Sequence, residues 1–354
     1  MTPGSKPFIT ANQVTTARLV PMPLIAWLIY QGETGWWIAV SLALVVGSTD
    51  YLDGYLARKH GPTALGALLD PLADKIFLAF MYVPLVDLGF LPVWPIALMF
   101  MREFLVTAMR SAYAQRAIHF ETSYLAKAKT WIQMQASGTL MLCGLFGRTG
   151  SLALLSSVFG LAVLALLFMR VLRGKLYKNL VVAMIFCAMP VGLYLLADAQ
   201  GDARVFFHGS TWILAALTWV SGLDYLVGGL PRLRAAGGFG RADAVRVVAA
   251  GALPILALLL LIETDAPAWA VLALLAFELA LGGLDNMLSL HGRAAPAVPW
   301  GVRALGVVAL LGAGLALPEQ ATIAAIAAAV VSAIGAVAEF WRGRDVYLAR
   351  AETG

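Results

Sequence analysis

Charge is scarce in this 354-residue chain: Asp, Glu, Lys and Arg make up only 13% of it. A typical soluble domain contains about 25% of these residues. Hydrophobic residues, in contrast, reach 61%. This composition excludes a soluble enzyme, a disordered protein and a nucleic-acid-binding module. It predicts a polytopic membrane protein that has the lipid bilayer as a partner and binds no nucleic acid.

Cysteine is almost absent. Its two copies, Cys143 and Cys187, both lie within apolar runs. Neither a disulfide framework nor a cysteine metal site is therefore expected. The first residues, MTPGSKPFIT, contain no apolar segment that ends in a cleavage site. We therefore expect no secretory signal peptide.

Long hydrophobic runs fill most of the chain. A bilayer core about 30 Å thick requires roughly 20 apolar residues per helix. This length predicts an all-α membrane bundle of about twelve transmembrane helices. The expected spans are 17–31, 36–57, 64–89, 92–114, 126–147, 151–171, 178–199, 206–230, 242–263, 267–289, 300–317 and 320–341. A stretch from Thr10 to Arg18 is expected to lie along the membrane interface before the first span.

The basic residues are distributed unevenly between the two sides of this predicted bundle. With a cytoplasmic N-terminus, 21 of the 25 Lys and Arg residues fall in cytoplasmic segments. Only Arg148 and Arg204 fall on the opposite side. Lys and Arg gather in cytoplasmic loops of membrane proteins. We therefore expect both termini to be cytoplasmic.

Four aspartates interrupt the second and third spans, where the chain reads DYLDGYLARKHGPTALGALLDPLADK. Asp50 and Asp53 are three residues apart, and Asp70 and Asp74 are four apart, so each pair lies on one face of its helix. The short connecting loop makes the two helices antiparallel neighbours. The four carboxylates are therefore predicted to converge.

Converging carboxylates require cations, and oxygen ligands without His or Cys suit Mg²⁺, Mn²⁺ or Ca²⁺. Gly54 and Gly66 allow a ligand to approach the backbone closely, and the fork of Arg58 suits phosphate. Together these residues predict a phosphate-containing substrate and phosphoryl-type transfer. The alternative is a set of solvated charges at the helix ends, but Asp74 lies too deep in its span for that role.

The pattern Asp50-x-x-Asp53-Gly54-x-x-Ala57-Arg58-x7-Gly66-x3-Asp70-x3-Asp74 resembles the signature of the CDP-alcohol phosphotransferases. The resemblance implies an integral-membrane enzyme that uses two divalent ions, Mg²⁺ or Mn²⁺. Such an enzyme transfers the phosphatidyl group of CDP-diacylglycerol to an alcohol and releases CMP. The resemblance also implies a homodimer in a bacterial inner membrane, with its active site facing the cytoplasm.

The resemblance assigns roles to individual positions. The expected metal ligands are Asp50, Asp53, Asp70 and Asp74. Asp74 also resembles the general base that takes the proton of the attacking alcohol. The residues expected to bind the CDP-lipid are Asn12, Thr15, Asp53, Gly54, Ala57, Arg58 and Gly66. An ordinary interfacial helix start is the alternative for Asn12 and Thr15, which belong to an N-x-x-T-x-x-R segment.

Further segments, including DPLADK and LTWVSGLDYL, resemble the bacterial phosphatidylglycerophosphate synthases, whose acceptor is glycerol 3-phosphate. An acceptor with its own phosphate needs cations, for which the candidates are Arg102, Arg110, Lys127 and Lys129. The alternative for Arg102 is an internal ion pair with an acid, and for Lys127 and Lys129 it is ordinary cytoplasmic positive charge. Other acceptors, namely inositol phosphate, another polyol phosphate or phosphatidylglycerol, also remain open, as does a twelve-helix transporter.

The chain is about twice as long as typical members of that branch. We expect a catalytic region at 1–230, with a helix pair inserted at about 151–199, and a four-helix extension at 231–354. The extension faintly echoes the first helices at an offset near 231, as a degenerate repeat or by chance. Glu278 and Asp285 lie on one helical face and are expected to form structural ion pairs with Arg293 or Arg303.

Overall fold

The computed structural model describes residues 11–60, 64–118, 124–146, 199, 202–293 and 296–348. Within these ranges the regular structure is helical and no strand occurs, as the all-α prediction requires. The helices are α1 (Ala11–Leu19), α2 (Met22–Ile29), α3 (Gly32–His60), α4 (Ala64–Asp87), α5 (Val93–Ala114), α6 (Tyr124–Phe146), α9 (Ala203–Val220), α10 (Leu223–Val227), α11 (Gly229–Ala235), α12 (Arg241–Glu263), α13 (Ala268–Leu290), α14 (Ala297–Ala316), the 3₁₀ helix η1 (Pro318–Gln320) and α15 (Ala321–Leu348). The expected span 151–171, and 178–199 except for residue 199, lie outside the described residues.

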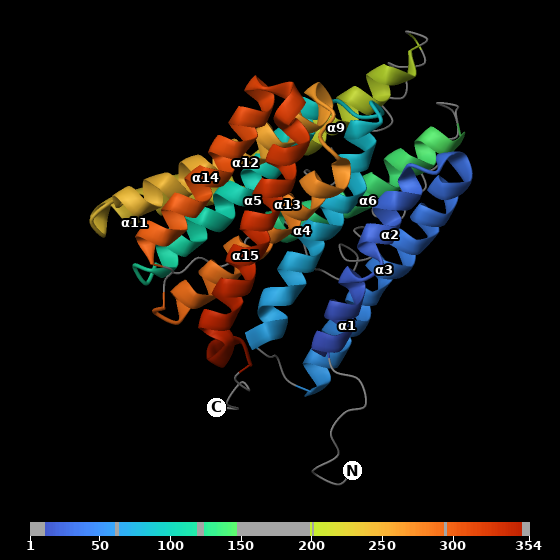
Figure 1. Cartoon of the computed structure of the whole chain (residues 1–354). Coiled ribbons are helices and arrows are strands. Elements are labelled where there is room, and N and C mark those ends of the chain that lie inside the picture. Colours follow the sequence, from blue (N-terminus) through green and yellow to red (C-terminus); the bar gives the residue numbers. More distant parts are fainter. Residues whose placement is uncertain are drawn as a thin grey trace.

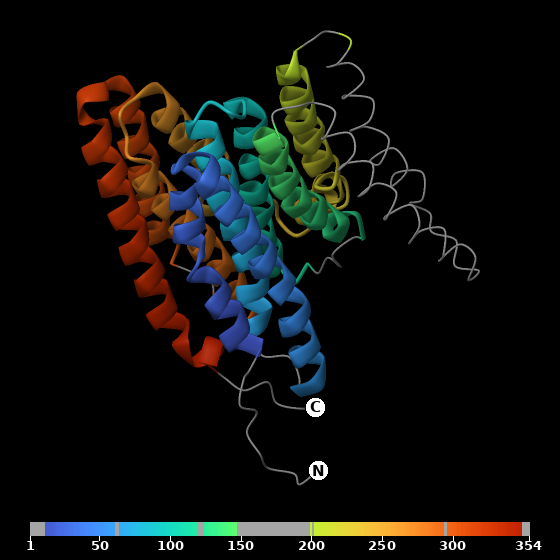
Figure 2. The same ribbon diagram turned by 90° about the vertical axis from the view of Figure 1, so that its right-hand side faces the viewer.

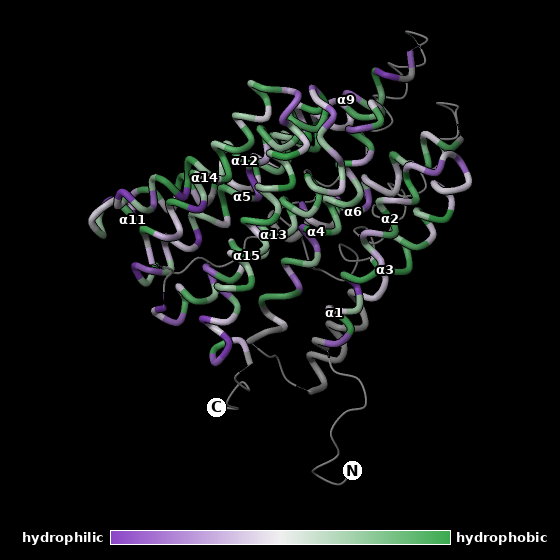
Figure 3. Tube along the Cα trace, in the orientation of Figure 1, coloured by the Kyte–Doolittle hydropathy of each residue, from purple (hydrophilic) through white to green (hydrophobic). Residues whose placement is uncertain are grey.

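Hydrophobic residues predominate along most of the helices, and many of the hydrophilic residues lie toward the helix ends (Figure 3). Five helical segments of the described chain are long and apolar enough to cross a membrane. They are Arg204–Ala235, Arg241–Glu263, Ala268–Leu290, Val298–Ala316 and Pro318–Tyr347. Helices α3 to α6 are 22 to 29 residues long and carry the charged residues of the sequence motifs.

The C-terminal helices form one bundle with the N-terminal ones. Helices α12 and α13 pack along α5, and α13 also packs on α4 (Figures 1 and 2). Arg116, just beyond the end of α5, bonds Asp243 in the first turn of α12 at 2.6 Å. Gln115 donates a hydrogen bond to Ser289 near the end of α13. The extension is therefore fixed directly to the region that carries the aspartates.

The first predicted span is broken in two at Pro21. Proline has no backbone N–H and cannot continue a helix at this point, so α1 ends at Leu19 and α2 begins at Met22. Helix α1 packs against both α3 and α4, and its polar residues Thr15 and Arg18 are fully buried. One face of this segment is therefore packed inside the bundle, while Gln13, Thr16 and Ala17 are exposed.

The predicted span 206–230 is also interrupted, because α9 ends at Val220 and a turn at Ser221 and Gly222 precedes α10. A Cβ atom at Gly222 would lie 2.8 Å from Nε of Arg102. The turn therefore depends on a residue without a side chain. It lets the chain after Ser221 fold against α5.

Helix positions repeat between the two ends of the chain. The starts of α12, α13, α14 and α15 follow those of α1, α3, α4 and α5 by 228 to 236 residues. The beginning of α1 and the end of α15 also lie at the same end of the bundle (Figure 1). This arrangement agrees with termini on one side of a membrane.

Close packing of α14 on α15 and α12 depends on Gly314, where a Cβ would lie 2.9 Å from both Ala324 Cβ and Leu260 Cδ1. We predict that Gly314→Ala lowers the free energy of unfolding by about 1–3 kcal/mol through overpacking. Gly312→Ala is the matched control, because its Cβ would meet nothing within 4 Å. Thermal unfolding in detergent, followed by circular dichroism, should show a lower Tm for Gly314→Ala. Equal Tm values for the two variants would contradict this packing.

Candidate active site

Asp70 and Asp74 lie one turn apart near the start of α4, and side chains of α1 contact both carboxylates. The Thr15 hydroxyl donates a hydrogen bond of 2.8 Å to Oδ1 of Asp70. Nη2 of Arg18 lies 3.2 Å from Oδ1 of Asp74. The Arg18 side chain is 1% exposed and that of Asp74 is 24% exposed. The N-terminal helix therefore orients the two carboxylates while leaving Asp74 accessible.

Apart from Gly66, the remaining residues of the motif lie on the last turns of α3, which is helical to His60. Their side chains lie outside the described part of the structure, as do those of Asn12 and Lys127. This applies to Asp50, Asp53, Ala57 and Arg58, and the surroundings of Gly54 are likewise not described. Gly66 is described, and it is buried in the first turn of α4. Because α1 packs on both α3 and α4, it joins the two helices that carry the motif.

The donor chemistry of the described pair fits a hard divalent cation. Asp70 and Asp74 offer carboxylate oxygens on one face of α4, and Mg²⁺ or Mn²⁺ is held by such oxygens. Within the described residues, no group of three or more His, Cys, Asp or Glu residues stands together. A complete ligand set therefore requires Asp50 and Asp53, and the convergence of all four aspartates stays a prediction.

A second polar cluster surrounds Glu103, which is buried in α5. Its carboxylate forms ion pairs with Arg102 at 3.3 Å and with Lys129 of α6. Lys75, the neighbour of Asp74, lies 3.9 Å from the same carboxylate and donates a 2.5 Å hydrogen bond to Thr107. One acid thus faces three basic side chains drawn from α4, α5 and α6. Among the described side chains of this cluster, the positive charges outnumber the one acid, which favours an anion.

The turn after α9 completes the basic cluster. Arg102 donates to the Ser221 hydroxyl at 3.1 Å, and Arg110 donates to the hydroxyl of Tyr225. Tyr113 fixes this segment through a 2.7 Å hydrogen bond to the Tyr225 carbonyl. The segment LTWVSGLDYL therefore lies against α5, next to the basic side chains.

The comparisons with known proteins agree with this arrangement. Residues 8–169 match the model of the family described as CDP-alcohol phosphatidyltransferase. A CDP-diacylglycerol--glycerol-3-phosphate 3-phosphatidyltransferase from Rickettsia bellii is 32% identical over 169 residues, which are 47% of this chain and 91% of the relative. A protein of the same name from Cereibacter sphaeroides is 30% identical over 229 residues, 63% of this chain and 96% of the relative. The chain belongs to the CDP-alcohol phosphatidyltransferase family.

A cardiolipin synthase (CMP-forming) from Streptomyces coelicolor is also similar, with 36% identity over 162 residues, 43% of this chain and 72% of the relative. No solved structure matches the chain. Relatives matched over most of their own length thus cover about half to two thirds of this family member. The residues of α12 to α15 lie beyond the part that the family model matches.

The structure also shows what the sequence interpretation missed. Arg102 does form an internal ion pair, which was the alternative prediction, and its partner is Glu103. Lys129 and Lys75 contact the same carboxylate. Lys75 and Arg18 were not expected to contact site residues. Their signals were local, since Lys75 directly follows Asp74 and Arg18 lies one turn beyond Thr15. Glu103 gave no sequence signal for binding three cations.

The acids of the extension form the expected structural ion pairs, with one change of partner. Glu278 binds Arg303. Asp285 binds Arg246 at 3.3 Å rather than either expected arginine, because Arg293 lies at the end of α13 and binds Asp345.

Glu103 neutralises part of the basic cluster, so its removal exposes the mutual repulsion of the cations. We predict that Glu103→Gln lowers the free energy of unfolding by about 3–5 kcal/mol, as when one partner of a buried ion pair is removed. Thermal unfolding in detergent measures the change, and Glu319→Gln, at an exposed site, should stay within about 0.5 kcal/mol of the parent. Glu103→Gln/Lys129→Gln should be more stable than Glu103→Gln alone. A Glu103→Gln protein as stable as the parent would rule out this role.

Proposed function

We propose that this family member transfers the phosphatidyl group of CDP-diacylglycerol to the hydroxyl of glycerol 3-phosphate, releasing CMP and forming phosphatidylglycerophosphate. The observation that carries the choice of acceptor is the basic cluster around Glu103. This cluster lies next to Asp74, because its member Lys75 directly follows Asp74 in the chain. An acceptor with its own phosphate matches this excess of positive charge. The printed names of the Rickettsia and Cereibacter relatives support the same acceptor.

Divalent-metal dependence is general in the family. In the proposal Asp50, Asp53, Asp70 and Asp74 hold two Mg²⁺ or Mn²⁺ ions. When bound, such ions neutralise the charge of the pyrophosphate and of the departing CMP. The Thr15 hydroxyl, 2.8 Å from Asp70, fixes the direction of that carboxylate.

The CDP-lipid is proposed to bind between the ends of α3 and α4. Arg58 is the proposed donor to its phosphates, because a guanidinium forms paired hydrogen bonds with phosphate oxygens. The other residues proposed at this site are Asn12, Thr15, Asp53, Gly54, Ala57 and Gly66. Gly66 has no side chain, which supports a close approach of the nucleotide at this point.

Asp74 is the proposed general base. Its carboxylate accepts the proton of the acceptor hydroxyl as that oxygen attacks the phosphatidyl phosphorus and the bond from phosphorus to the CMP oxygen breaks. The 24% exposure of its side chain supports access by a substrate. Arg18, at 3.2 Å, positions the carboxylate without occupying both of its oxygens through that contact.

The acceptor's phosphate is proposed to bind among the basic side chains of α4, α5 and α6. These are Lys75, Arg102, Arg110, Lys127 and Lys129. Hydroxyl groups of Ser221 and Tyr225 hold Arg102 and Arg110. Positioned guanidinium groups lose less entropy on binding a phosphate than mobile ones.

The proposal places the protein in a bacterial inner membrane as a bundle of about twelve helices, with both termini and the active site toward the cytoplasm. The distribution of Lys and Arg supports this orientation. Residues 1–230 form the proposed catalytic region, with an insertion at about 151–199. Residues 231–354 form the extension, and the repeated helix positions support its origin as a degenerate copy of the first helices. A homodimer stays a prediction.

We predict that purified protein with CDP-diacylglycerol and Mg²⁺ or Mn²⁺ releases CMP when glycerol 3-phosphate is added. Glycerol is the matched control, since it carries a free hydroxyl in place of the phosphate that the basic cluster would bind. Its turnover should be lower by at least about 100-fold, the loss expected when buried charged groups remain unpaired. Release with phosphatidylglycerol or inositol phosphate instead would keep the chemistry and reject this acceptor.

We predict that Asp74→Asn lowers CMP release by about 10²–10⁴-fold, the range that a general base contributes. Asparagine keeps the size and one oxygen of the side chain but does not accept the proton. Asp265→Asn, in the exposed turn between α12 and α13, is the matched control and should leave turnover unchanged. Parental turnover in a folded Asp74→Asn protein would reject Asp74 as the base.

A further inference from the structure

The first turns of α4 are held from two opposite sides. On one side, side chains of α1 contact the carboxylates of Asp70 and Asp74. On the other side, Leu68 is buried in a cluster with residues from the ends of α13 and α15. Asp70 follows Leu68 by two residues, which is about 200° around a helix. Helices beyond the part that the family model matches therefore cover the side of α4 opposite its aspartates.

Helix α13 approaches Leu68 closely. A Cβ atom at Gly283 would lie 3.1 Å from Cδ1 of Leu68, which is closer than ordinary van der Waals contact. The absence of a side chain at Gly283 thus lets Leu68 reach the backbone of α13. Leu284 and Leu288, one turn apart on α13, are buried in the same cluster as Leu68. Leu68 is therefore enclosed by one face of α13.

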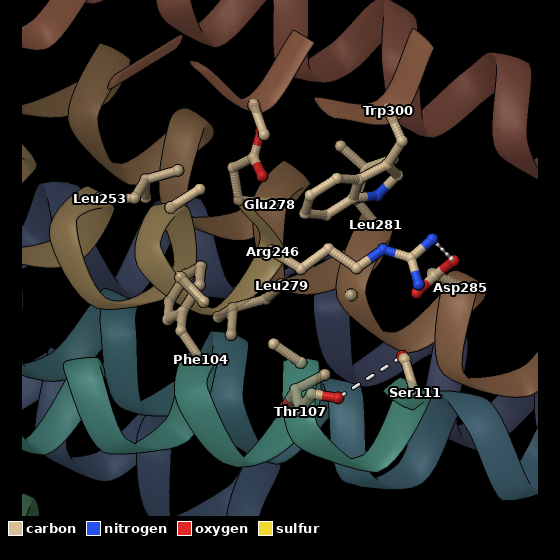
Figure 4. A pocket seen from close by; sticks show the side chains of 15 residues that line it. Phe104, Thr107, Ser111, Arg246, Leu253, Glu278, Leu279, Leu281, Asp285 and Trp300 are labelled. Atoms are coloured by element: carbon tan, nitrogen blue, oxygen red, sulfur yellow. Dashed lines mark hydrogen bonds and ion pairs between the residues drawn. The ribbon is translucent and has the colours of Figure 1, made fainter. Parts of the chain in front are cut away.

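An ion pair fixes the rotation of α13 in the bundle. Arg246 of α12 extends to Asp285 of α13, with 3.3 Å between Nη2 and Oδ1 (Figure 4). Both side chains are 3% exposed. Separating such a buried pair costs about 3–5 kcal/mol. Asp285 follows Gly283 by two residues on α13, so a rotation that moved Gly283 away from Leu68 would also disturb this ion pair.

The last turns of α15 complete the contact. Tyr347 is 1% exposed and belongs to the cluster around Leu68, and its hydroxyl donates a 3.2 Å hydrogen bond to the carbonyl of Leu284. A Cβ at Gly343 would lie 2.6 Å from Cδ2 of Leu288, so α15 and α13 are in close contact here. The end of α15 and the start of α4 lie at the same end of the bundle (Figures 1 and 2).

The start of α4 needs such support. The first four N–H groups of a helix have no acceptor within the helix, and local opening begins where few buried contacts hold the chain. Leu68 is the fifth residue of α4 and Asp70 the seventh. Mg²⁺ requires nearly octahedral oxygen ligands at about 2.0–2.1 Å. A functional group usually has to be held within about 0.5 Å of its productive position. Contacts of Leu68 that oppose opening of this turn therefore also oppose displacement of Asp70.

We propose that Gly283, Leu284, Leu288 and Tyr347 form a clamp around Leu68 and are positioning residues that hold Asp70 in place for the divalent ions. The clamp acts through the backbone of α4 and touches neither substrate nor metal. It gives the C-terminal extension a part in the transfer reaction. This inference rests on the proposed function, because it takes Asp70 as a metal ligand.

The test is Mn²⁺ binding to the full-length protein in detergent, measured by electron paramagnetic resonance without substrate. Tyr347→Ala removes the ring from the clamp and should raise the Kd for Mn²⁺ about tenfold, the lower end of the loss seen when groups that support metal ligands are removed. Tyr347→Phe keeps the ring and should bind Mn²⁺ like the parent. Trp341→Ala is the matched control, because it removes an aromatic ring from the same helix at a 59% exposed position. It should also bind like the parent.

A second variant removes the same contact from the side of α4. Leu68→Ala should raise the Kd for Mn²⁺ by a similar factor. Leu68→Ala/Tyr347→Ala should bind little more weakly than either single variant, because residues that act through one contact have non-additive effects. All variants are first compared with the parent by Tm and gel filtration. If Tyr347→Ala does not fold, Leu68→Ala carries the same test.

Hydrogen exchange measures the clamp without metal. Tyr347→Ala should speed exchange of the amides of residues 64–72, whereas Trp341→Ala should leave their rates unchanged. Parental Mn²⁺ affinity in folded Tyr347→Ala and Leu68→Ala proteins would overturn the proposal, as would fully additive losses in the double variant. A parent protein that binds no Mn²⁺ would instead overturn the metal assignment of the proposed function, and the clamp's role with it. The two failures are therefore distinguishable.

Discussion

The cost of burying charge among apolar helices governs the interior of this protein. A charged side chain near the middle of a membrane helix costs roughly 2.5–3.5 kcal/mol even on insertion scales. The described interior nevertheless contains Arg18, Arg102, Glu103, Lys129 and Arg246. Arg18, Glu103, Lys129 and Arg246 each contact a group of opposite charge from another helix, whereas Arg102 pairs with Glu103 of its own helix. These ion pairs determine which helices can be neighbours and in which rotation they face one another.

Helix α5 is the element that most of these contacts share. It carries Glu103 toward α4 and α6, and it also packs against α12 and α13. It also meets the turn after α9 through Arg102 and Ser221. The part of the chain that the family model matches and helices beyond that part thus use one helix in common. A movement of α5 would change the basic cluster and the packing of α12 and α13 together.

Hydrophobic run length predicts the helices well, because a bilayer requires about 20 apolar residues in a row. The expected spans 242–263 and 267–289 differ by one residue at most from α12 and α13. The breaks at Pro21 and after Val220 were missed, although Pro21 itself carries a signal. Run length does not report a turn when apolar residues continue on both sides of it.

The candidate site was predictable where its residues lie close together in the chain. Asp70 and Asp74 share a helical face because of their spacing, and Thr15 and Arg18 follow the same rule in α1. Glu103 was not predictable in this way. Its partners come from three helices, and Lys129 is 26 residues away. No local periodicity encodes which distant cation will face a buried acid.

The shared carboxylate of Glu103 has a consequence for biogenesis. Helix α5 emerges from the ribosome with Arg102 and Glu103 ahead of Lys129 of α6, which follows Glu103 by 26 residues. Alone in the bilayer, Glu103 of α5 would have Arg102 beside it but not Lys129, and Lys75 of α4 would lack Glu103. Entry of α4, α5 and α6 into lipid as one group avoids that intermediate. The ion pairs that define the mature site thus also favour delayed, joint release of these three segments from the insertion machinery.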